Sequence, residues 1–411
     1  MTEAANLAPS VRAEYDTART VLVHEPGAEL LSALLWPEES CFARCFDSTS
    51  ARREHRAFTE ALSSLGVEVL RLGDLLQRSD RLREMAADTL SFPLEAPSDQ
   101  ERSTILDVLS SADLVRILLE RPAVSVRERG SFDPELRSRA LSNLYFVRDQ
   151  LLTTDRGVVL GRFARPVRRP EVGVVRAALE AAGIRPLYAI EPEGVLEGGD
   201  FMAAGQWGLF GIGARSNQQA IDQLLTLPGA RALGYERLAV VRDPETSRDW
   251  QQQQMHLDTY FMLVGADTCI VEASRIREPK QPITEVDGGL RPMAADRRPL
   301  VDTYRKTTCE EYVLEQADIP FLEFLQSHLE IENIIPVLLE DQYAFGCNVL
   351  CLRERMVLGS LSAEQSELQR EPYLRQLALS GVECATVDFT NLRQGFGSNH
   401  CVTQVLVREV Q

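Results

Sequence analysis

The stretch Gly395-Phe396-Gly397-Ser398-Asn399-His400-Cys401, followed by a strand-like run over residues 402–407, lies near the C-terminal end of this 411-residue chain. Glycine adopts backbone conformations that are closed to other residues, so Gly395 and Gly397 predict a tight turn that presents Cys401 in a pocket. The alternative interpretation is a buried cysteine that packs as a small apolar residue at the start of a strand. Segments upstream in the chain help to distinguish a reactive thiol from a buried structural one.

Three of those segments place carboxylates or a histidine beside strand-like runs. They are Phe146-Val147-Arg148-Asp149, Leu196-Glu197-Gly198-Gly199-Asp200 and Met255-His256-Leu257-Asp258. A thiol, an imidazole and several carboxylates are the groups that nucleophilic attack on a cationic substrate requires. The first two segments also have a purely structural explanation. Asp149 can pair with Arg148 at a strand end, and the Glu197-Gly198-Gly199-Asp200 segment can form an acidic turn. His256 and Asp258 would project from one face of a strand.

The composition is that of a globular protein with a large core, with 44% hydrophobic and 26% charged residues. Acidic residues outnumber basic ones by 61 to 44, which gives a formal net charge of −17. This field repels nucleic acid and anionic membrane surfaces and mildly favours a cationic small molecule. We therefore expect a small-molecule substrate and neither a nucleic-acid nor a membrane partner; a homo-oligomer remains open.

The eight cysteines do not suggest a metal site. Cys41 and Cys45, like Cys347 and Cys351, are separated by three residues, and no histidine or cysteine cluster with zinc-finger spacing completes either pair. No basic and apolar leader and no membrane-spanning run are visible. We expect a cytoplasmic protein without a metal or another cofactor.

A helix, a glycine and a strand recur three times along the chain, over residues 52–70, 177–190 and 377–389. The recurrence predicts a repeated α/β architecture. Residues 73–140 interrupt it with two amphipathic helices, at 75–90 and 102–119, and few strand signals. Further expectations are strands at 20–23, 144–147, 158–160, 238–241, 334–339 and 349–352, helices at 218–225, 309–329 and 363–380, and a surface loop or lid at 274–305.

Taken together, the motifs resemble those of the arginine deiminase family, within the guanidino-group-modifying (amidinotransferase) superfamily. The resemblance covers roughly residues 18–408. The matching segments are Asn143–Asp149, Pro166–Arg169, Leu196–Asp200, Gly211–Arg215, Met255–Thr259, Asp341–Tyr343, Gly346–Asn348 and His400-Cys401.

The resemblance implies an α/β fold, a five-bladed propeller of ββαβ units with its active site in the central channel. It implies a catalytic domain over residues 1–72 and 141–411 and a helical insert over residues 73–140. It also implies that Cys401 is the nucleophile, that His256 is the general acid and base, and that Glu197 holds His256. Asp149 and Asp258 would bind the guanidinium nitrogens. Asn143, Arg168 and Arg215 would grip the amino-acid end of the substrate, and Phe146 would pack on its apolar stem.

The implied reaction converts L-arginine, or a close analogue, to L-citrulline and ammonia through an amidino-thioether on Cys401. An amidinotransferase that releases ornithine, or a silent arginine-binding relative, is the alternative. The sequence departs from the family at Gln150, where proline is usual, at Val147 and in a shortened loop near residues 46–49. It also departs at Phe396, where an arginine usually helps to recognise the amino-acid end; Arg393 is the nearest arginine.

Overall fold

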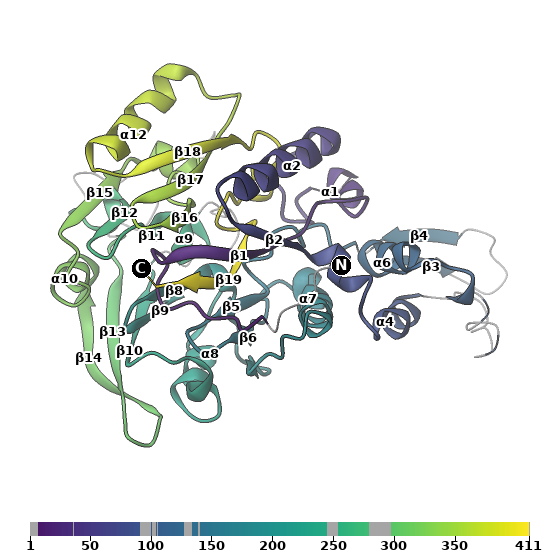
Figure 1. Cartoon of the computed structure of the whole chain (residues 1–411), viewed down its shortest axis with the longest axis horizontal. Coiled ribbons are helices and arrows are strands. Elements are labelled where there is room, and N and C mark those ends of the chain that lie inside the picture. The colour runs from purple at the N-terminus through teal and green to yellow at the C-terminus, as the bar shows by residue number, and fades with distance from the viewer. Residues whose placement is uncertain are drawn as a thin grey trace.

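The computed structural model describes residues 7–35, 37–90, 100, 104, 106–126, 134–138, 140–244, 254–278 and 297–410. The fold is mixed α/β. Figure 1 shows strands toward the middle of the main body and helices around them. Five of these helices are α2 (Ser48–Ser64), α7 (Arg169–Ala181), α8 (Gln218–Leu225), α10 (Phe321–Ser327) and α12 (Glu367–Leu379).

Five sheets of the described chain share one pattern, in which an antiparallel pair is followed by a parallel partner. One of the five helices lies in the chain between the second and third strands of each sheet. In order of strands, the sheets are β19 (Gln404–Glu409), β1 (Thr17–Val23) and β2 (Glu68–Arg71); β5 (Leu151–Thr153), β6 (Val158–Leu160) and β7 (Tyr188–Ala189); β8 (Phe201–Ala204), β9 (Trp207–Ile212) and β10 (Arg237–Arg242); β11 (Phe261–Leu263), β12 (Thr268–Glu272) and β15 (Asn333–Val337); and β16 (Leu350–Arg353), β17 (Met356–Leu361) and β18 (Glu383–Asp388).

The three predicted helix-glycine-strand units are confirmed. Gly66, Gly183 and Gly381 follow α2, α7 and α12 with φ angles of 81°, 78° and 76°. This left-handed conformation ends a helix and turns the chain toward the next strand, and it costs glycine little. The predicted strand at 20–23 and helix at 218–225 correspond to β1 and α8, and those at 158–160 and 238–241 to β6 and β10.

Two predictions from apolar patterns were wrong. Residues 144–147 were expected to form a strand, but they lie in a buried turn and β5 begins only at Leu151. A short apolar run indicates that its residues are buried, but it does not by itself distinguish a strand from a buried turn. The helix expected over 309–329 is instead β14 (Tyr312–Pro320) followed by α10. β14 pairs with β13 (Leu300–Lys306), so tertiary pairing overrides the local pattern.

The loop expected over 274–305 is confirmed neither as a loop nor as a lid. Its end forms β13, which pairs with β10 and extends that sheet to five strands. Its beginning contains the short helix η5 (Ala273–Arg275). Residues 279–296 lie outside the described residues.

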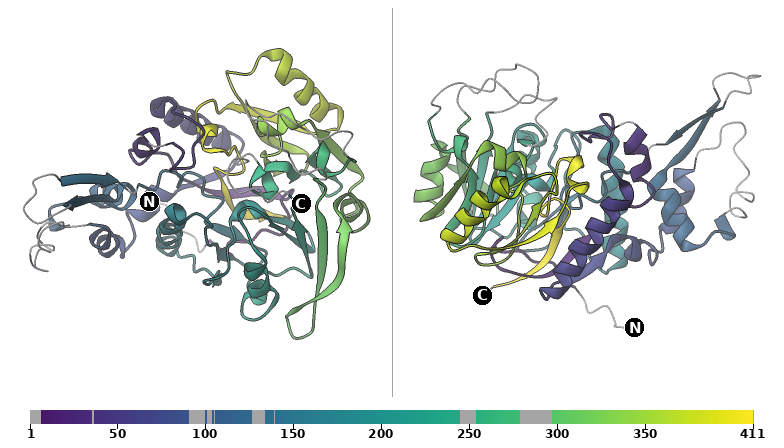
Figure 2. Two further views of the ribbon diagram at one scale, coloured as in Figure 1. Left: turned by 180° about the vertical axis from the view of Figure 1, so that it is seen from behind. Right: turned by 90° about the horizontal axis from the view of Figure 1, so that it is seen from above.

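The segment from residue 72 onward adds helices to one side of the molecule, and Figures 1 and 2 show it extending away from the main body. It contains α3 (Leu72–Leu76), α4 (Leu82–Thr89) and α6 (Ser111–Glu120), so the helix expected over 75–90 is broken between α3 and α4. The helix expected over 102–119 is also broken, because the helical residues 106–107 are separated from α6 by the non-helical residues 108–110. An unexpected hairpin, β3 (Pro122–Val126) with β4 (Pro134–Ser138), follows. Within the described residues, none of the helices combines the length and apolar character that crossing a bilayer needs.

Candidate functional site

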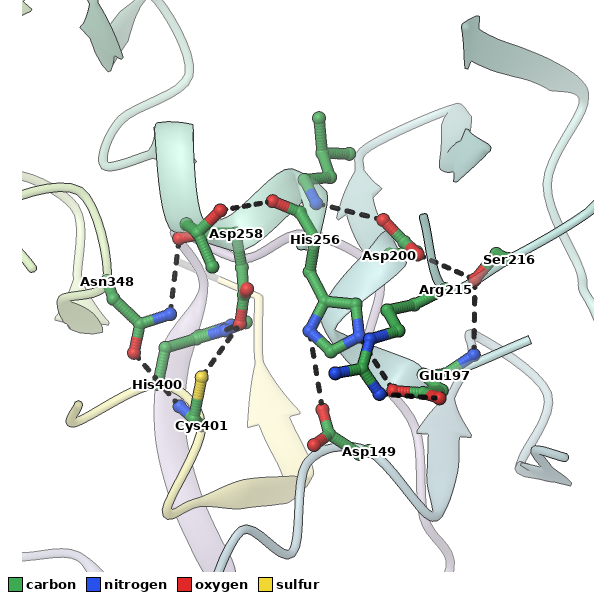
Figure 3. A network of polar contacts seen from close by, with 12 residues as sticks. Asp149, Glu197, Asp200, Arg215, Ser216, His256, Asp258, Asn348, His400 and Cys401 are labelled. Carbon is green, nitrogen blue, oxygen red and sulfur yellow. Dashed lines mark hydrogen bonds and ion pairs between the residues drawn. The ribbon is translucent and has the colours of Figure 1, made fainter. Parts of the chain in front are cut away.

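Residues of one polar cluster come from equivalent positions in the five sheets, because each lies just before the first strand of its sheet. Asp149 precedes β5, Glu197 precedes β8, His256 precedes β11, Asn348 precedes β16 and Cys401 precedes β19. All five side chains are buried, at no more than 4% exposure. Figure 3 shows them together in one network.

The turn before Cys401 is shaped by Asn348 and by two glycines. The side-chain oxygen of Asn348 accepts hydrogen bonds from the backbone N–H groups of Ser398 (3.0 Å) and Cys401 (3.2 Å). A Cβ on Gly397 would lie 2.6 Å from the ring of Phe146 and 2.8 Å from Cβ of Cys401, so no larger residue fits there without movement. Gly395 is similarly crowded by Phe146. The predicted tight turn is confirmed, but the predicted reason was wrong: Phe396, and neither glycine, has the left-handed φ angle, and the glycines are needed because neighbouring side chains leave no room for a Cβ.

Asp258 connects the thiol to a second histidine. It accepts a hydrogen bond from Cys401 Sγ at 3.6 Å, and its Oδ2 lies 2.7 Å from His400 Nδ1. Burial, together with the charges of Asp258 and Asp149, raises the pKa of Cys401 well above its usual value. The expected strand at His256 and Asp258 was wrong, because His256 caps the short helix α9 (Leu257–Tyr260) and Asp258 lies in its first turn.

His256 lies between two carboxylates. Its Nε2 is 2.9 Å from Glu197 Oε2, and its Nδ1 is 3.8 Å from Asp149 Oδ1. Burial opposes protonation of His256, but Asp149, Glu197 and Asp200 outweigh it and raise its pKa to about 9. Although burial disfavours the charged form of Glu197, Arg215 and His256 lower its pKa below the usual value. The imidazole is therefore a cation at neutral pH.

The Glu197-Gly198-Gly199-Asp200 segment is more than an acidic turn. A Cβ on Gly198 would meet the Arg148 carbonyl at 1.9 Å, and one on Gly199 would meet His256 Nδ1 at 2.6 Å. The glycines thus let this backbone pack against both the Asp149 segment and the imidazole. Asp200 accepts from the backbone N–H of Leu257 (2.9 Å) and from Ser216 (2.6 Å), which anchors the histidine segment.

The arginine partner of Asp149 is not the one suggested by its sequence neighbour. Asp149 Oδ2 accepts from Arg168 at 2.6 Å, whereas Arg148 points to Glu14, at 3.6 Å. The structural explanation that pairs Asp149 with Arg148 was therefore wrong. Arg168 comes from η1 (Pro166–Arg168), close to Asp149 in space.

The other residues implied by the resemblance lie around this cluster. Arg215 Nη1 is 3.9 Å from Glu197, and the Asn143 side chain donates to the Ser40 carbonyl at 2.6 Å. Phe146 is buried, and its ring packs against Tyr145 with centroids 4.1 Å apart.

The positions that depart from the family also have defined surroundings. Phe396 is partly buried, and its backbone is left-handed, with a φ angle of 66°. Arg393 lies 3.9 Å from Glu364. Gln150 donates to Glu171 at 2.6 Å, a bond that a proline could not make.

Several buried polar atoms in and around the cluster have no hydrogen-bond partner among the described residues, among them Asp149 Oδ1, Asp258 Oδ1, His256 Nδ1 and His400 Nε2. Leaving a buried carboxylate oxygen unpaired is costly unless a donor arrives from elsewhere. The two carboxylate oxygens among these atoms, Asp149 Oδ1 and Asp258 Oδ1, suit a flat cation that carries several N–H donors.

The cluster also offers atoms that could hold a metal ion. One ligand atom each from Asp149, Glu197 and His256 lie within 4.8 Å of one another. However, metal binding requires a neutral imidazole, and the raised pKa of His256 favours its protonated form. Arg168 and Arg215 already lie against the two carboxylates. The donor set fits an organic cation better, and the absence of a resident metal remains a prediction.

Sequence reasoning gave no role to Asn348, His400, Asp200 or Glu14. Glu14 accepts from Arg408 at 2.9 Å and lies 3.8 Å from His400 Nε2, so it holds the far side of that imidazole. Three of these residues lie in segments that match the family, namely Asn348, His400 and Asp200. Their place in those segments was the sequence feature that could have identified them as site residues. No local pattern marks Glu14.

Comparison with known proteins agrees with these motifs. A model of the family described as "Arginine deiminase" matches residues 40–408. Relatives named arginine deiminase include one from Halobacterium salinarum, 22% identical and covering 96% of this chain and of that protein, and one from Mycolicibacterium gilvum, 29% identical and covering 95% and 96%. A solved structure of an amidinotransferase from Microseira wollei is similar in fold, with a TM-score of 0.57 at 14% identity over 98% of both chains. The chain therefore belongs to the arginine deiminase family.

Proposed function

We propose that the protein hydrolyses the guanidinium group of free L-arginine, or of a close analogue, to give L-citrulline and ammonia. The observation that carries this proposal is a pair of buried carboxylate oxygens, Asp149 Oδ1 and Asp258 Oδ1, that have no hydrogen-bond partner among the described residues and belong to the network that holds Cys401 and a protonated His256. A guanidinium stays charged at physiological pH and presents a planar fork of donors. Asp149 and Asp258 would each accept from it.

In the first step, the Cys401 thiolate attacks the guanidino carbon, and a C–S bond forms. Because the pKa of Cys401 is raised by burial and by the two aspartates, the thiol is protonated without substrate. The positive charge of a bound guanidinium offsets those aspartates and favours the thiolate, and the thiol proton is released to solvent as the substrate binds. His256 then gives its proton to the departing nitrogen, the C–N bond breaks and ammonia leaves. This yields an amidino-thioether on Cys401.

In the second step, water replaces the sulfur. The now neutral His256, held by Glu197 at 2.9 Å, accepts a proton from water, whose oxygen bonds to the amidino carbon. The C–S bond breaks, the thiol is restored and a ureido product is released. One water is consumed and one ammonia is formed.

The alternative candidate is an amidinotransferase, and the similarity in fold to an amidinotransferase keeps it in view. Such an enzyme would also form a C–S bond between Cys401 and the guanidino carbon. The group that leaves in this step would be ornithine instead of ammonia. Incubation of the purified protein with L-arginine, with and without an acceptor amine, separates the two. Citrulline and ammonia without an acceptor support the hydrolase; ornithine that appears only with an acceptor overturns it. The absence of any product, with arginine still bound, would indicate a silent binding protein.

We also propose that the five sheets are the blades of a five-bladed propeller around the site. Their common strand pattern and the equivalent positions of the five polar residues support this arrangement. Residues 1–72 and 141–411 would form this catalytic domain, with residues 73–140 inserted into it. A cytoplasmic location also remains part of the proposal.

A further inference from the structure

We propose that Gln342 is a positioning residue that holds both ends of the segment 254–259, which carries His256 and Asp258. The inference rests on the proposed function, because His256 and Asp258 are the general acid and a guanidinium-binding carboxylate only if that reaction takes place. Gln342 lies in a segment that matches the family, Asp341–Tyr343, and neither the resemblance nor the proposed reaction gives it a role.

The segment that carries His256 and Asp258 needs hydrogen-bond partners from elsewhere in the chain. Its helix, α9, has only four residues, and the last four carbonyl groups of a helix have no partner within it. Asn348 Nδ2 donates to the carbonyl of Asp258 at 3.2 Å, and Gln342 Nε2 donates to the carbonyl of Thr259 at 2.9 Å. Two side-chain amides from the chain before β16 therefore hold the C-terminal part of the segment.

The same Gln342 side chain also contacts the start of the segment. Its Oε1 accepts from Nε2 of Gln254, which lies two residues before His256, at 3.1 Å. Gln342 is 0% exposed and Gln254 is 3% exposed, so bulk water does not compete for these bonds. A side-chain amide carries a donor and an acceptor together, and both are used here. One residue thereby bridges Gln254 and Thr259.

Gln342 is itself held in a closed turn. It lies in α11 (Leu339–Tyr343), and the backbone N–H of Gly346 donates to the carbonyl of Asp341 at 2.8 Å. A Cβ on Gly346 would lie 2.9 Å from that carbonyl oxygen, so the two strands of the turn approach closely. Gln342 and Asn348 consequently reach α9 from one compact part of the chain.

Gln254 is supported by a buried arginine. Its Oε1 accepts from Arg297 Nη2, and Arg297 Nη1 donates to Ser274 Oγ at 2.9 Å and to Glu272 at 3.3 Å. Glu272 is the last residue of β12. The hydrogen bonds therefore run from the end of this strand through Gln254 and Gln342 to α9.

The position of the segment sets two distances on which the proposed reaction depends. His256 Nε2 lies 2.9 Å from Glu197, and Cys401 Sγ donates to Asp258 at 3.6 Å. Because His256 and Asp258 are two residues apart in one short segment, a shift of its backbone changes both distances together. Gln342 acts on the two residues through this backbone.

The test replaces Gln342 by methionine, which is similar in length but has neither amide group. We expect kcat on L-arginine to fall on the order of a hundredfold, because a displacement of about 1 Å at reacting groups costs about that factor. NMR titration without substrate should show the pKa of His256 lowered from about 9 by roughly one unit or more, since its contact with Glu197 lengthens. Gln376→Met is the matched control. Gln376, on α12, also donates to a backbone carbonyl, that of Pro336 at 2.7 Å, and its substitution should change neither value.

A second variant, Gln254→Met, removes the bond at one end and leaves the bond from Gln342 to Thr259. It should lower kcat by about tenfold and lower the pKa of His256 by less than Gln342→Met does. If Gln342→Met does not fold, Gln254→Met decides by the same two measurements. An unchanged pKa of His256 would overturn the proposal, even in a variant that is less stable in urea denaturation, because Gln342 would then support the fold and not the imidazole.

The titration keeps this inference separable from the proposed reaction. It uses the protein without substrate, and the spectrum of His256→Asn identifies the signal among the five histidines. If the wild-type protein yields no ammonia from L-arginine, the proposed reaction fails, whereas the pKa comparison still supports or refutes the role of Gln342. If ammonia forms and the pKa of His256 is the same in all variants, the reaction stands and the role of Gln342 is refuted.

Discussion

At the scale of single residues, the candidate site is a set of buried charges whose protonation states depend on one another. Burial, Asp258 and Asp149 favour the protonated thiol of Cys401. The carboxylates on either side of His256 stabilise the protonated form of its imidazole. A bound guanidinium would reverse the first preference and partly offset the effect of Asp149 on His256, whereas Glu197, 2.9 Å from His256 Nε2, would still favour the imidazolium. Nucleophile and acid can then coexist in the states that the proposed reaction needs.

Removal of the thiol tests the nucleophile directly. Cys401→Ala should lower ammonia release from L-arginine by more than about a thousandfold, because no other group can form the covalent intermediate. Circular dichroism should show an unchanged fold. Cys309→Ala, at an exposed cysteine, is the control and should retain full activity. Turnover that survives in Cys401→Ala would refute the assignment.

The charge on His256 can be measured. Asp149→Asn removes a carboxylate 3.8 Å from Nδ1 and should lower the His256 pKa from about 9 by roughly one to three units. Because the folded-state pKa is raised, protonated His256 stabilises the fold fully below pH ~6.5 and loses this contribution as the pH rises through about 9. NMR titration of the five histidines reads the shift. An unchanged value would mean that Asp149 is not its partner; Asp267→Asn, at a partly exposed surface aspartate, should leave it unchanged.

At the scale of elements, the segments before the first strands hold the residues of the candidate site, and a helix lies in the chain between the second and third strands of each sheet. The turn at Gly397 has no room for a side chain, whereas Gly173 lies on an exposed part of α7 with no atom within 4 Å of a built Cβ. Two identical substitutions should therefore have opposite effects.

Gly397→Ala should displace the Cys401 side chain and lower kcat on the order of a hundredfold, since small misplacements of reacting groups are costly. Gly173→Ala should keep full activity and raise the free energy of unfolding by about 0.5–1 kcal/mol, through helix propensity. Ammonia release and urea denaturation measure the two effects. Full activity in Gly397→Ala would show that the turn tolerates a side chain.

At the scale of the whole molecule, the two ends of the chain complete one sheet. β19 pairs with β1, and this pairing places Cys401 among residues from the other four sheets. Glu14 and Arg408 form a fully buried ion pair 394 residues apart, and they lie behind His400. The site therefore depends on the chain closing on itself.

Breaking this pair should be strongly destabilising. Glu14→Ala leaves Arg408 buried without its carboxylate and should lower the free energy of unfolding by about 3–5 kcal/mol. The exposed pair Arg19–Glu409 joins the same two strands, and Arg19→Ala should cost less than about 1 kcal/mol. Chemical denaturation measures both. Equal losses would indicate that strand pairing, and not the buried charge, holds the ends together.

The sequence by itself determined the helix-glycine-strand units and named four of the five residues that meet in the cluster, because these depend on short-range geometry and on residue chemistry. It gave no role to Asn348, and the need for glycine at position 397 comes largely from Phe146, which is distant in the chain. Tertiary structure decided what local patterns cannot encode. The apolar run at 144–147 is a buried turn, β14 is a strand because β13 pairs with it, and Asp149 meets Arg168 instead of its neighbour Arg148. The physical reason is the same in each case: partners distant in the chain supply the hydrogen bonds and charges that settle the conformation, and only the folded arrangement brings them together.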